Sequence, residues 1–262
     1  MKTDFFDDSI EPLNDPELPI APGVIPQGAK KFLYDQSKLI MGRMIGYKDL
    51  RMIYASAIKV VKTKLEILST EFSLRYHRNP ISAVHSRLKS TASIMKKLDK
   101  LGCKMTLESI EDKVNDVAGV RVICSYVDDI YLIADAITKQ SDVELLLEKD
   151  YVASPKPNGY RSLHLIVKVP VYLSDKRVDT KVEIQIRTIA MDFWASLEHQ
   201  LRYKKDSPDA DVIVDELREC AESINSADVK MSELRLRMES MEEKSSDDEL
   251  FERFSKFDMP ID

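Results

Sequence analysis

The sequence predicts an α+β protein built on one mixed β-sheet of about five strands, flanked by helices. Two observations indicate this class. Segments in which apolar and polar residues alternate are interspersed with segments whose apolar residues recur every three or four positions, and the two kinds do not alternate strictly. Long helical patterns also occur near both ends of the chain, before residue 80 and after residue 206.

The N-terminal region divides into an arm and a helix. Residues 1–29 hold five of the eleven prolines and many acids, which predicts an extended or disordered arm. A long amphipathic helix is expected from Tyr47 until Asn79 and Pro80 end it. Its apolar positions are Leu50, Ile53, Ala57, Val61, Leu65, Leu68, Phe72 and Tyr76.

The central region, residues 80–205, supplies the sheet. The expected strands are residues 81–89, 120–126, 144–151, 162–171 and 181–188, and the expected helices are residues 91–101, 128–138 and 189–204. Gly102 ends the first of these helices, and Asp128 is expected to cap the second. The last two strands are expected to form a hairpin.

The C-terminal helix is expected at residues 206–243, followed by a loosely ordered acidic tail at residues 244–262. Apolar side chains recur there in alternating steps of four and three, as in the a and d positions of a coiled coil. We expect this seam to pack on another helix, by self-association or in a bundle, rather than on the domain's own core. Its members are Ile213, Leu217, Cys220, Ile224, Ala227, Met231, Leu234, Met238 and Met241.

Composition limits the class of protein. With 262 residues, 44% of them hydrophobic, the chain fits one large domain with helical additions. A net charge of −6 makes general nucleic-acid binding unlikely on electrostatic grounds, and no run of about 18 apolar residues predicts a membrane span. The acidic N-terminus does not resemble a secretory signal. Three cysteines without a CxxC pair predict reduced thiols in a cytoplasmic protein.

Two kinds of sequence motif are absent, and their absence limits the reactions that the sequence predicts. The seven glycines form neither a P-loop nor a GxGxxG turn, so any use of ATP follows another binding mode. None of the four histidines precedes an aspartate or forms HExxH, which excludes the usual histidine-rich metal hydrolases.

Two segments predict a site for phosphate. Between Arg87 and Lys104 there are six basic residues and one acid, at a junction of strand and helix where cations and helix N–H groups meet. Taken alone, this segment is better explained as a solvated helix face, on which lysines are common. Asp116 precedes the next strand, where Arg121 points away from the apolar face; by itself, Asp116 also fits a simple turn cap.

Two further segments predict a polar strand pair and a loop. Tyr160 follows an Asn-Gly turn and leads into a strand that carries His164; such a tyrosine can stack on a base or simply pack. In residues 182–188, Glu183, Gln185 and Arg187 share one strand face. If Glu183 meets Asp116 across the sheet, the two carboxylates beside a basic cluster form a Mg²⁺ site on a phosphate substrate.

Together these strings resemble the synthetase domain of the RelA/SpoT family, which makes the alarmones ppGpp and pppGpp. The matching strings cover roughly residues 80–205 and are RLKSTASIMKK, DVAGVRVIC, KPNGYRSLH, VEIQIRT and WASLEHQLRYK. Each string is weak by itself, but the five in this order are specific. Because only about 80 residues precede them and no His-Asp dipeptide occurs, we expect a small alarmone synthetase without hydrolase activity.

The resemblance implies a nucleotidyltransferase-like synthetase fold and transfer of the β,γ-pyrophosphate of ATP to the ribose 3′-hydroxyl of GDP or GTP. It implies that Asp116 and Glu183 hold Mg²⁺ and that Glu183 activates the hydroxyl. Arg87 and Arg121 would sandwich adenine. The ATP phosphates would lie on Lys89, Ser93, Lys97 and Lys100. Tyr160 would stack on guanine, near Lys156, Asn158, His164, Gln185 and Glu198.

The chain departs from the family pattern at an effector site. Some small synthetases are homotetramers whose central cleft binds pppGpp as an activator. Ala83 and His85 stand here in place of an aromatic residue and a threonine, and Asp192 replaces a polar amide. Because a carboxylate repels an anionic effector, we expect no such activation. The heptad pattern still predicts a homotetramer formed through the terminal helices.

Two alternative functions remain open from the sequence. An enzyme of the same fold could pyrophosphorylate an adenine nucleotide or the 3′ end of tRNA, although Lys156, Asn158 and Tyr160 favour guanine. The chain could also be a non-catalytic, nucleotide-binding assembly protein. The presence of both Asp116 and Glu183 argues against this second alternative.

Overall fold

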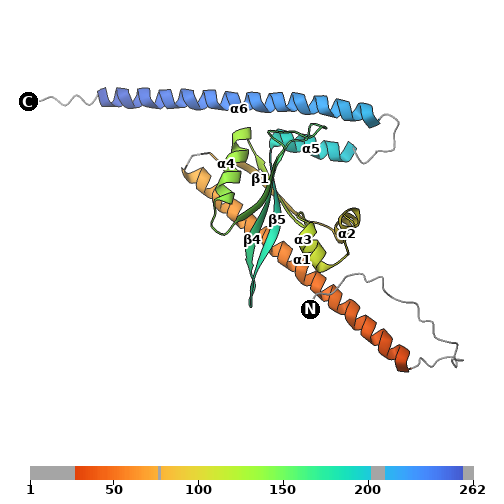
Figure 1. Ribbon diagram of the computed structural model, residues 1–262. Helices are drawn as coiled ribbons and strands as arrows, with labels where there is room; N and C mark the ends of the chain where they lie inside the picture. Colours follow the sequence, from red (N-terminus) through yellow and green to blue (C-terminus); the bar gives the residue numbers. More distant parts are fainter. Residues whose placement is uncertain (1–26, 76–77, 202–209, 256–262) are drawn as a thin grey trace, which may run out of the picture.

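The computed structural model describes residues 27–75, 78–201 and 210–255 (Figure 1). Its centre is a five-stranded mixed sheet of order β1-β2-β5-β4-β3, in which β2 and β5 are parallel and the other neighbouring strands antiparallel. This confirms the predicted α+β class. The strands are β1 (Ile81–Leu88), β2 (Ala118–Cys124), β3 (Glu144–Asp150), β4 (Leu163–Tyr172) and β5 (Arg177–Thr188).

Six helices surround the sheet in the described part of the chain. They are α1 (Gln27–Arg75), α2 (Thr91–Lys100), α3 (Leu107–Lys113), α4 (Val127–Thr138), α5 (Ile189–Leu201) and α6 (Ala210–Ser255). Figure 1 shows α1 running diagonally across the sheet, α2 and α3 beside it, and α6 lying over α4 and α5. No helix among the described residues is both long and apolar enough to cross a membrane. All three cysteines are free thiols, as predicted.

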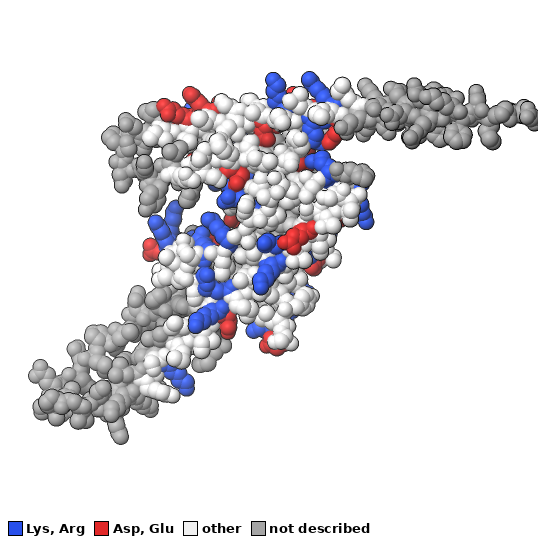
Figure 2. Space-filling model, turned by 180° about the vertical axis from the view of Figure 1, so that it is seen from behind, with Lys and Arg blue, Asp and Glu red and all other residues white. Residues whose placement is uncertain are grey.

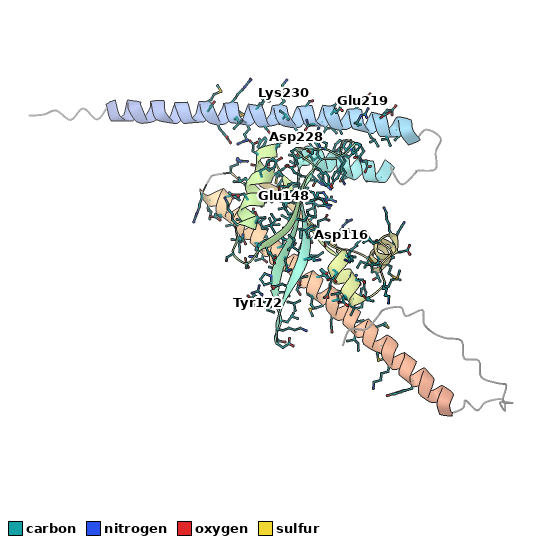
Figure 3. All side chains as sticks on the ribbon, viewed as in Figure 1. Asp116, Glu148, Tyr172, Glu219, Asp228 and Lys230 are labelled. Carbon is teal, nitrogen blue, oxygen red and sulfur yellow. The ribbon has the colours of Figure 1, made fainter. Side chains whose placement is uncertain are left out.

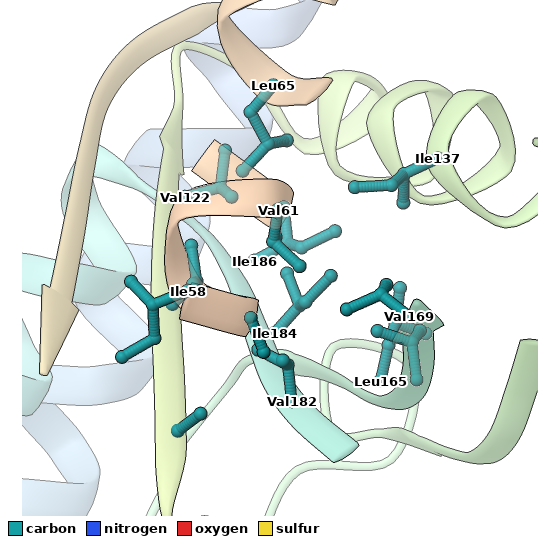
Figure 4. Close-up of a cluster of buried hydrophobic side chains, with 14 of the residues drawn as sticks. Ile58, Val61, Leu65, Val122, Ile137, Leu165, Val169, Val182, Ile184 and Ile186 are labelled. Atoms are coloured by element: carbon teal, nitrogen blue, oxygen red, sulfur yellow. The ribbon is translucent and has the colours of Figure 1, made fainter. Parts of the chain in front are cut away.

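The core lies between α1 and one face of the sheet (Figure 4). Val61 and Leu65 of α1 are fully buried, as are Val182, Ile184 and Ile186 of β5. Burial of each such side chain stabilises the fold by about 1.5–3 kcal/mol. Because side chains alternate along a strand, the intervening polar residues of β5 lie on the opposite face, which is therefore available for a site.

Two helices differ from the prediction. α1 begins at Gln27 rather than Tyr47, and so includes the end of the expected arm; residues 1–26 lie outside the described residues. Its first turns carry exposed apolar side chains such as Met41 and Met44, so no core-facing pattern marks them. α3 was not expected. Thr106 caps it by accepting a hydrogen bond from the Ser109 N–H at 3.0 Å, a short signal that the sequence does contain.

The predicted cap of α4 is wrong: the helix begins at Val127 with Tyr126 as its N-cap, and Asp128 lies inside the first turn. Asp129, also in the first turn, accepts a hydrogen bond from the backbone N–H of Tyr126 at 3.2 Å. Asp129 is completely buried, and both of its oxygens accept hydrogen bonds from the Arg78 guanidinium, at 2.7 and 2.9 Å. The burial of this carboxylate is possible because the bidentate pair compensates its charge. Asp128 instead forms an ion pair with Arg235 of α6 at 2.9 Å.

The predicted seam of α6 divides between two environments. Leu217 and Ile224 pack on Trp194 of the same chain, whereas Met231 and Met238 are 54% and 62% exposed. The helix also continues to Ser255, so the expected loose tail is helical over residues 244–255; residues 202–209 and 256–262 lie outside the described part. The remaining predicted elements occur within a few residues of their expected bounds, including the β4–β5 hairpin.

A buried hydrogen bond fastens α6 to the end of β5. The hydroxyl of Thr188 donates to Asp228 at 2.6 Å and accepts from the backbone N–H of Met191 at 3.1 Å. Figure 3 shows Asp228 on the side of α6 that faces the domain. Burial raises the pKa of the Asp228 carboxyl above its ordinary value, although the bond from Thr188 acts in the other direction.

Asp228→Asn should therefore stabilise the protein at neutral pH. When the pKa of a carboxyl is raised in the folded state, the folded protein becomes less stable as the pH rises from the ordinary pKa to the raised one. The loss of stability persists at every pH above that window. We expect the variant to gain about 1 kcal/mol in the free energy of unfolding near pH 7. Urea unfolding at about pH 7 and about pH 4 measures this, and the difference should shrink at the lower pH. Asp142→Asn, at an exposed carboxylate, is the control; a variant less stable than wild type at neutral pH would contradict the expectation.

Candidate active site

The candidate site lies on the face of the sheet opposite the α1 core. Strand register places its side chains in rows across β1, β2 and β5. These rows are Arg87–Gly119–Glu183 and His85–Arg121–Gln185. Together with Ser86 and Val120 they line a pocket of about 130 Å³. The structure therefore brings together residues that are nearly 100 positions apart in the sequence.

A cluster of opposite charges lies next to this pocket. The carboxylate of Asp116 accepts hydrogen bonds from Lys89 at 2.6 Å and from Lys97 at 2.7 Å. Burial alone raises the pKa of Asp116, but the two ammonium groups outweigh it and lower the pKa below its ordinary value. Asp116 is consequently ionised at neutral pH. The two lysines expected to hold phosphates are thus paired with a predicted metal ligand.

Glu183 is held by two neighbours on the sheet. One of its oxygens lies 3.2 Å from Nδ1 of His164, and the other accepts a hydrogen bond from Gln185 at 3.0 Å. Burial and the charge of Asp116 both raise the pKa of Glu183, yet the interactions with His164 and Gln185 lower it overall. Asp116 is thus close enough for its charge to act on Glu183; that the two carboxylates share a metal ion stays a prediction.

Tyr160 connects this carboxylate to the loop before β4. Its hydroxyl accepts a hydrogen bond from Arg187 at 2.6 Å and lies 2.7 Å from Nε2 of His164. Because an ionised Glu183 can only accept, Nδ1–H of His164 donates to Glu183. The Tyr160 hydroxyl has one proton and two lone pairs, so the direction of its bond with Nε2 depends on whether that nitrogen carries a proton. Lys156 lies 4.5 Å from the centre of the Tyr160 ring. The predicted stacking residue is therefore linked by hydrogen bonds to the predicted catalytic carboxylate.

The loop itself is shaped by Asn158 and Gly159. Asn158 accepts a hydrogen bond from the backbone N–H of Tyr160 at 3.3 Å and donates to Glu198 of α5 at 3.2 Å. Gly159 has φ of +84°, a conformation that other residues rarely adopt. Lys156 closes the turn by accepting from the Gly159 N–H at 2.8 Å. The Lys156, Asn158, Tyr160 and Glu198 group predicted from the sequence is thus one local unit.

Two predicted phosphate ligands lie on α2, further from these contacts. The Ser93 hydroxyl accepts a hydrogen bond from Ser90, the residue that caps the helix, at 2.9 Å. Lys100 is exposed in the last turn and forms no ion pair with a described residue. Figure 2 shows several Lys and Arg side chains, with acidic side chains among them, on the middle of the domain below α6. That Ser93 and Lys100 bind phosphate stays a prediction.

Sequence reasoning missed two members of the site. Arg187 was recognised on the polar face of β5 but given no role, and Asp192 was interpreted as a carboxylate that repels an anionic effector. In the structure Asp192 forms ion pairs with Arg121 and Arg187, so its charge is compensated. The available signal was its position in the first turn after β5, which directs it back toward the strand ends.

This arrangement belongs to a known family. Residues 86–208 match the profile of the region found in RelA/SpoT proteins, and the chain belongs to the RelA/SpoT family. It is 44% identical over 188 residues to the GTP pyrophosphokinase YwaC of Bacillus subtilis, an alignment that spans 72% of this chain and 90% of the relative.

Solved structures agree with this assignment. The small alarmone synthetase 2 of Bacillus subtilis superposes with a TM-score of 0.66 at 43% identity, over 73% of this chain and 98% of that one. The small alarmone synthetase 1 of the same organism, solved with its product pppGpp, has a TM-score of 0.67 at 33% identity, over 73% and 97% of the two chains.

The C-terminal helix supports the loop from behind. Trp194 of α5 donates a hydrogen bond to the backbone carbonyl of Leu217 at 2.9 Å, and Tyr160 packs against Trp194 and Ala221. A Cβ atom added to Gly159 would overlap with the Cβ of Ala221. The loop therefore needs glycine here for two reasons, its positive φ and the close approach of α6.

Gly159→Ala should destabilise the protein more than Gly102→Ala. Both glycines have positive φ, but only Gly159 has Ala221 against it. We expect a loss of about 1 kcal/mol for Gly102→Ala and about 2–4 kcal/mol for Gly159→Ala, because overpacking adds to the backbone strain. Urea unfolding measures both losses.

A double-mutant cycle with Ala221→Gly isolates the overlap. Removing the Ala221 methyl costs about 1 kcal/mol in the wild-type helix but should restore part of the stability of Gly159→Ala. Strictly additive losses in this cycle would show that α6 does not press on the loop.

Proposed function

We propose an assignment of roles for the reaction of this chain, which is a GTP pyrophosphokinase. In that reaction the β,γ-pyrophosphate of ATP passes to the 3′-oxygen of GDP or GTP, AMP leaves, and the product is ppGpp or pppGpp. The observation that carries the assignment is the pocket lined by Arg87, Arg121 and Glu183, together with the Asp116–Lys89–Lys97 cluster and the contacts that run from Glu183 through His164 to Tyr160.

The ATP subsite is formed by β1, β2 and α2. Arg87 and Arg121 both line the pocket, and their guanidinium planes suit the two faces of adenine. Lys89, Ser93, Lys97 and Lys100 would then receive the phosphates. Lys89 and Lys97 can exchange Asp116 for phosphate oxygens when ATP binds, and this exchange releases the carboxylate for a cation.

Asp116 and Glu183 would hold Mg²⁺, whose hard character matches carboxylate oxygens. The residues fit this ion in their chemistry, because Lys89 and Lys97 keep the pKa of Asp116 below its ordinary value and His164 and Gln185 do the same for Glu183, so both side chains offer ionised oxygens. Among the described residues no three His, Cys, Asp or Glu side chains gather to hold a metal, so phosphates and water would complete the ligands. When bound, Mg²⁺ neutralises charge on the transferred pyrophosphate.

The acceptor subsite follows from the Tyr160 loop. The Tyr160 ring would stack on guanine, with Lys156, Asn158, His164, Gln185 and Glu198 around the nucleotide. Ionised Glu183 can accept a hydrogen bond from the ribose 3′-hydroxyl and orient its oxygen in line with the pyrophosphate. His164 keeps Glu183 in place by donating to its other side. Positioning of this kind is the main requirement of phosphoryl transfer.

Glu183→Gln should lower kcat by about 10²-fold or more, because the amide cannot hold the cation or accept the hydroxyl proton. The measurement uses Mg²⁺, γ-labelled ATP and, in separate reactions, GDP, GTP, GMP, ADP and bulk tRNA, with products resolved by anion exchange. Glu148→Gln, on the exposed edge strand β3, is the matched control.

The acceptor that gains label decides between the alternatives. Label on GDP or GTP with release of AMP is the expected result. Label on ADP or tRNA would leave the assignment of the ATP subsite standing but would contradict the assignment of the Tyr160 loop to a guanine nucleotide. Nucleotide binding without any transfer would favour the non-catalytic assembly protein.

We also propose an oligomeric state and a cellular compartment for this chain. Figure 1 shows α6 and α1 extending past the sheet, and exposed apolar side chains lie on both helices, among them Met231 and Met238 of α6 and Met41 and Met44 of α1. Several exposed apolar side chains on one helix are typical of a protein interface. We therefore assign the terminal helices to a homotetramer interface. The site of action is the cytoplasm, where ATP and guanine nucleotides are available.

Replacing Met231 and Met238 together by Asp should reduce the oligomer to a smaller species, because charges would enter an apolar interface. Sedimentation velocity measures the change. Ser226→Asp with Ser240→Asp adds the same charges at other exposed positions of α6 and should leave the size unchanged. An unchanged sedimentation coefficient for the methionine variant would contradict the interface.

A further inference from the structure

One carboxylate joins the two halves of the active site. Oδ1 of Asp192 forms an ion pair with Nη1 of Arg121 at 3.1 Å and a second ion pair with Nη1 of Arg187, also at 3.1 Å. Arg121 projects from β2 and Arg187 from the adjacent parallel strand β5. Asp192 lies in the first turn of α5, which begins directly after β5, and it therefore reaches both strands from their ends. We call these three residues the Arg121–Asp192–Arg187 bridge.

On the acceptor side, the bridge holds a buried cation. Arg187 is only 4% exposed, and it donates to the hydroxyl of Tyr160 at 2.6 Å and to Gln185 at 3.0 Å. Its guanidinium also lies 5.1 Å from the centre of the Tyr160 ring. A buried guanidinium requires an anionic partner, and Asp192 supplies it. Without Asp192, Arg187 would be less well ordered, and its hydrogen bond to the Tyr160 hydroxyl would weaken.

On the donor side, the bridge restrains a longer, partly exposed side chain. Arg121 lines the pocket opposite Arg87, and its side chain is 35% exposed. A free arginine samples many rotamers, and ordering it on binding costs entropy. The ion pair with Asp192 engages one nitrogen of the guanidinium, and Arg121 still lines the pocket. Arg121 is thus ordered before a nucleotide arrives.

We propose that Asp192 is a positioning residue that couples the ATP subsite to the acceptor subsite. It orders Arg121 for the donor nucleotide and, through Arg187, orders Tyr160 for the acceptor. This inference rests on the proposed function, and it adds a residue that contacts neither substrate. The single carboxylate between two guanidinium groups leaves a net positive charge, which is compatible with anionic nucleotides on both sides.

Asp192→Asn is the direct test. The amide keeps the size of the side chain but loses the charge that holds both arginines. We expect KM to rise about five- to tenfold for ATP and for GDP alike, with kcat changed less than about threefold. Asp142→Asn, which removes the charge of an ion pair with Lys64 outside the pocket, is the matched control and should change neither KM.

A second variant separates positioning from a merely structural role. Arg121→Gln leaves Asp192 paired with Arg187, so it should raise KM for ATP and leave KM for GDP unchanged. Adding Asp192→Asn to Arg121→Gln should cause no rise in KM for ATP beyond that of Arg121→Gln alone, because Asp192 acts on ATP only through Arg121. The KM for GDP should still rise in the double variant.

Equilibrium binding keeps this test independent of turnover. Calorimetry with a non-hydrolysable ATP analogue and with GDP should show both affinities falling in Asp192→Asn. If the wild-type protein binds both nucleotides but transfers no pyrophosphate, the proposed function is wrong. The two affinities of Asp192→Asn still test whether the Arg121–Asp192–Arg187 bridge couples the subsites. If Asp192→Asn lowers only the unfolding temperature, or changes one affinity alone, the coupling role is overturned.

Discussion

The parallel pairing of β2 with β5 is the constraint on which the rest of the structure depends. It places Glu183 beside Gly119 and Gln185 beside Arg121, and at the same time buries Val182, Ile184 and Ile186 against α1. A shift of one residue would exchange the two faces, burying the charges and exposing the aliphatic side chains. The hydrophobic core and the active site are thus specified by the same register.

The charged groups of the site compensate one another until substrates arrive. Asp116 is held by lysines, Glu183 by His164, and Asp192 by two arginines. Each pair makes a partly buried charge tolerable and fixes its position. In the proposed reaction, nucleotide phosphates replace Asp116 as the partner of its lysines. A catalytic surface of this kind is ordered in advance, which is the main contribution that a protein can make to phosphoryl transfer.

The C-terminal helix links this surface to the periphery of the molecule. One side of α6 contacts the Tyr160 loop through Ala221 and the end of β5 through Asp228. Its remaining apolar side chains, including Met231 and Met238, are exposed. The heptad pattern was a correct sign of an apolar stripe, but it combined residues that pack on the chain's own domain with residues that do not. The heptad period alone cannot distinguish a helix face that packs on its own domain from one that packs on another helix, because both faces require apolar side chains.

The sequence by itself determined the α+β class, most element positions, the polar face of β5 and the family. These depend on local alternation and on short ordered strings, both of which can be read without coordinates. Only the tertiary structure decided that Asp129 rather than Asp128 is buried against Arg78 at the start of α4, that α1 begins at Gln27, and that Asp192 lies between two arginines. Neighbouring carboxylates are equivalent in a local pattern. Which of them is buried, and which cation meets it, depends on how distant strands and helices pack.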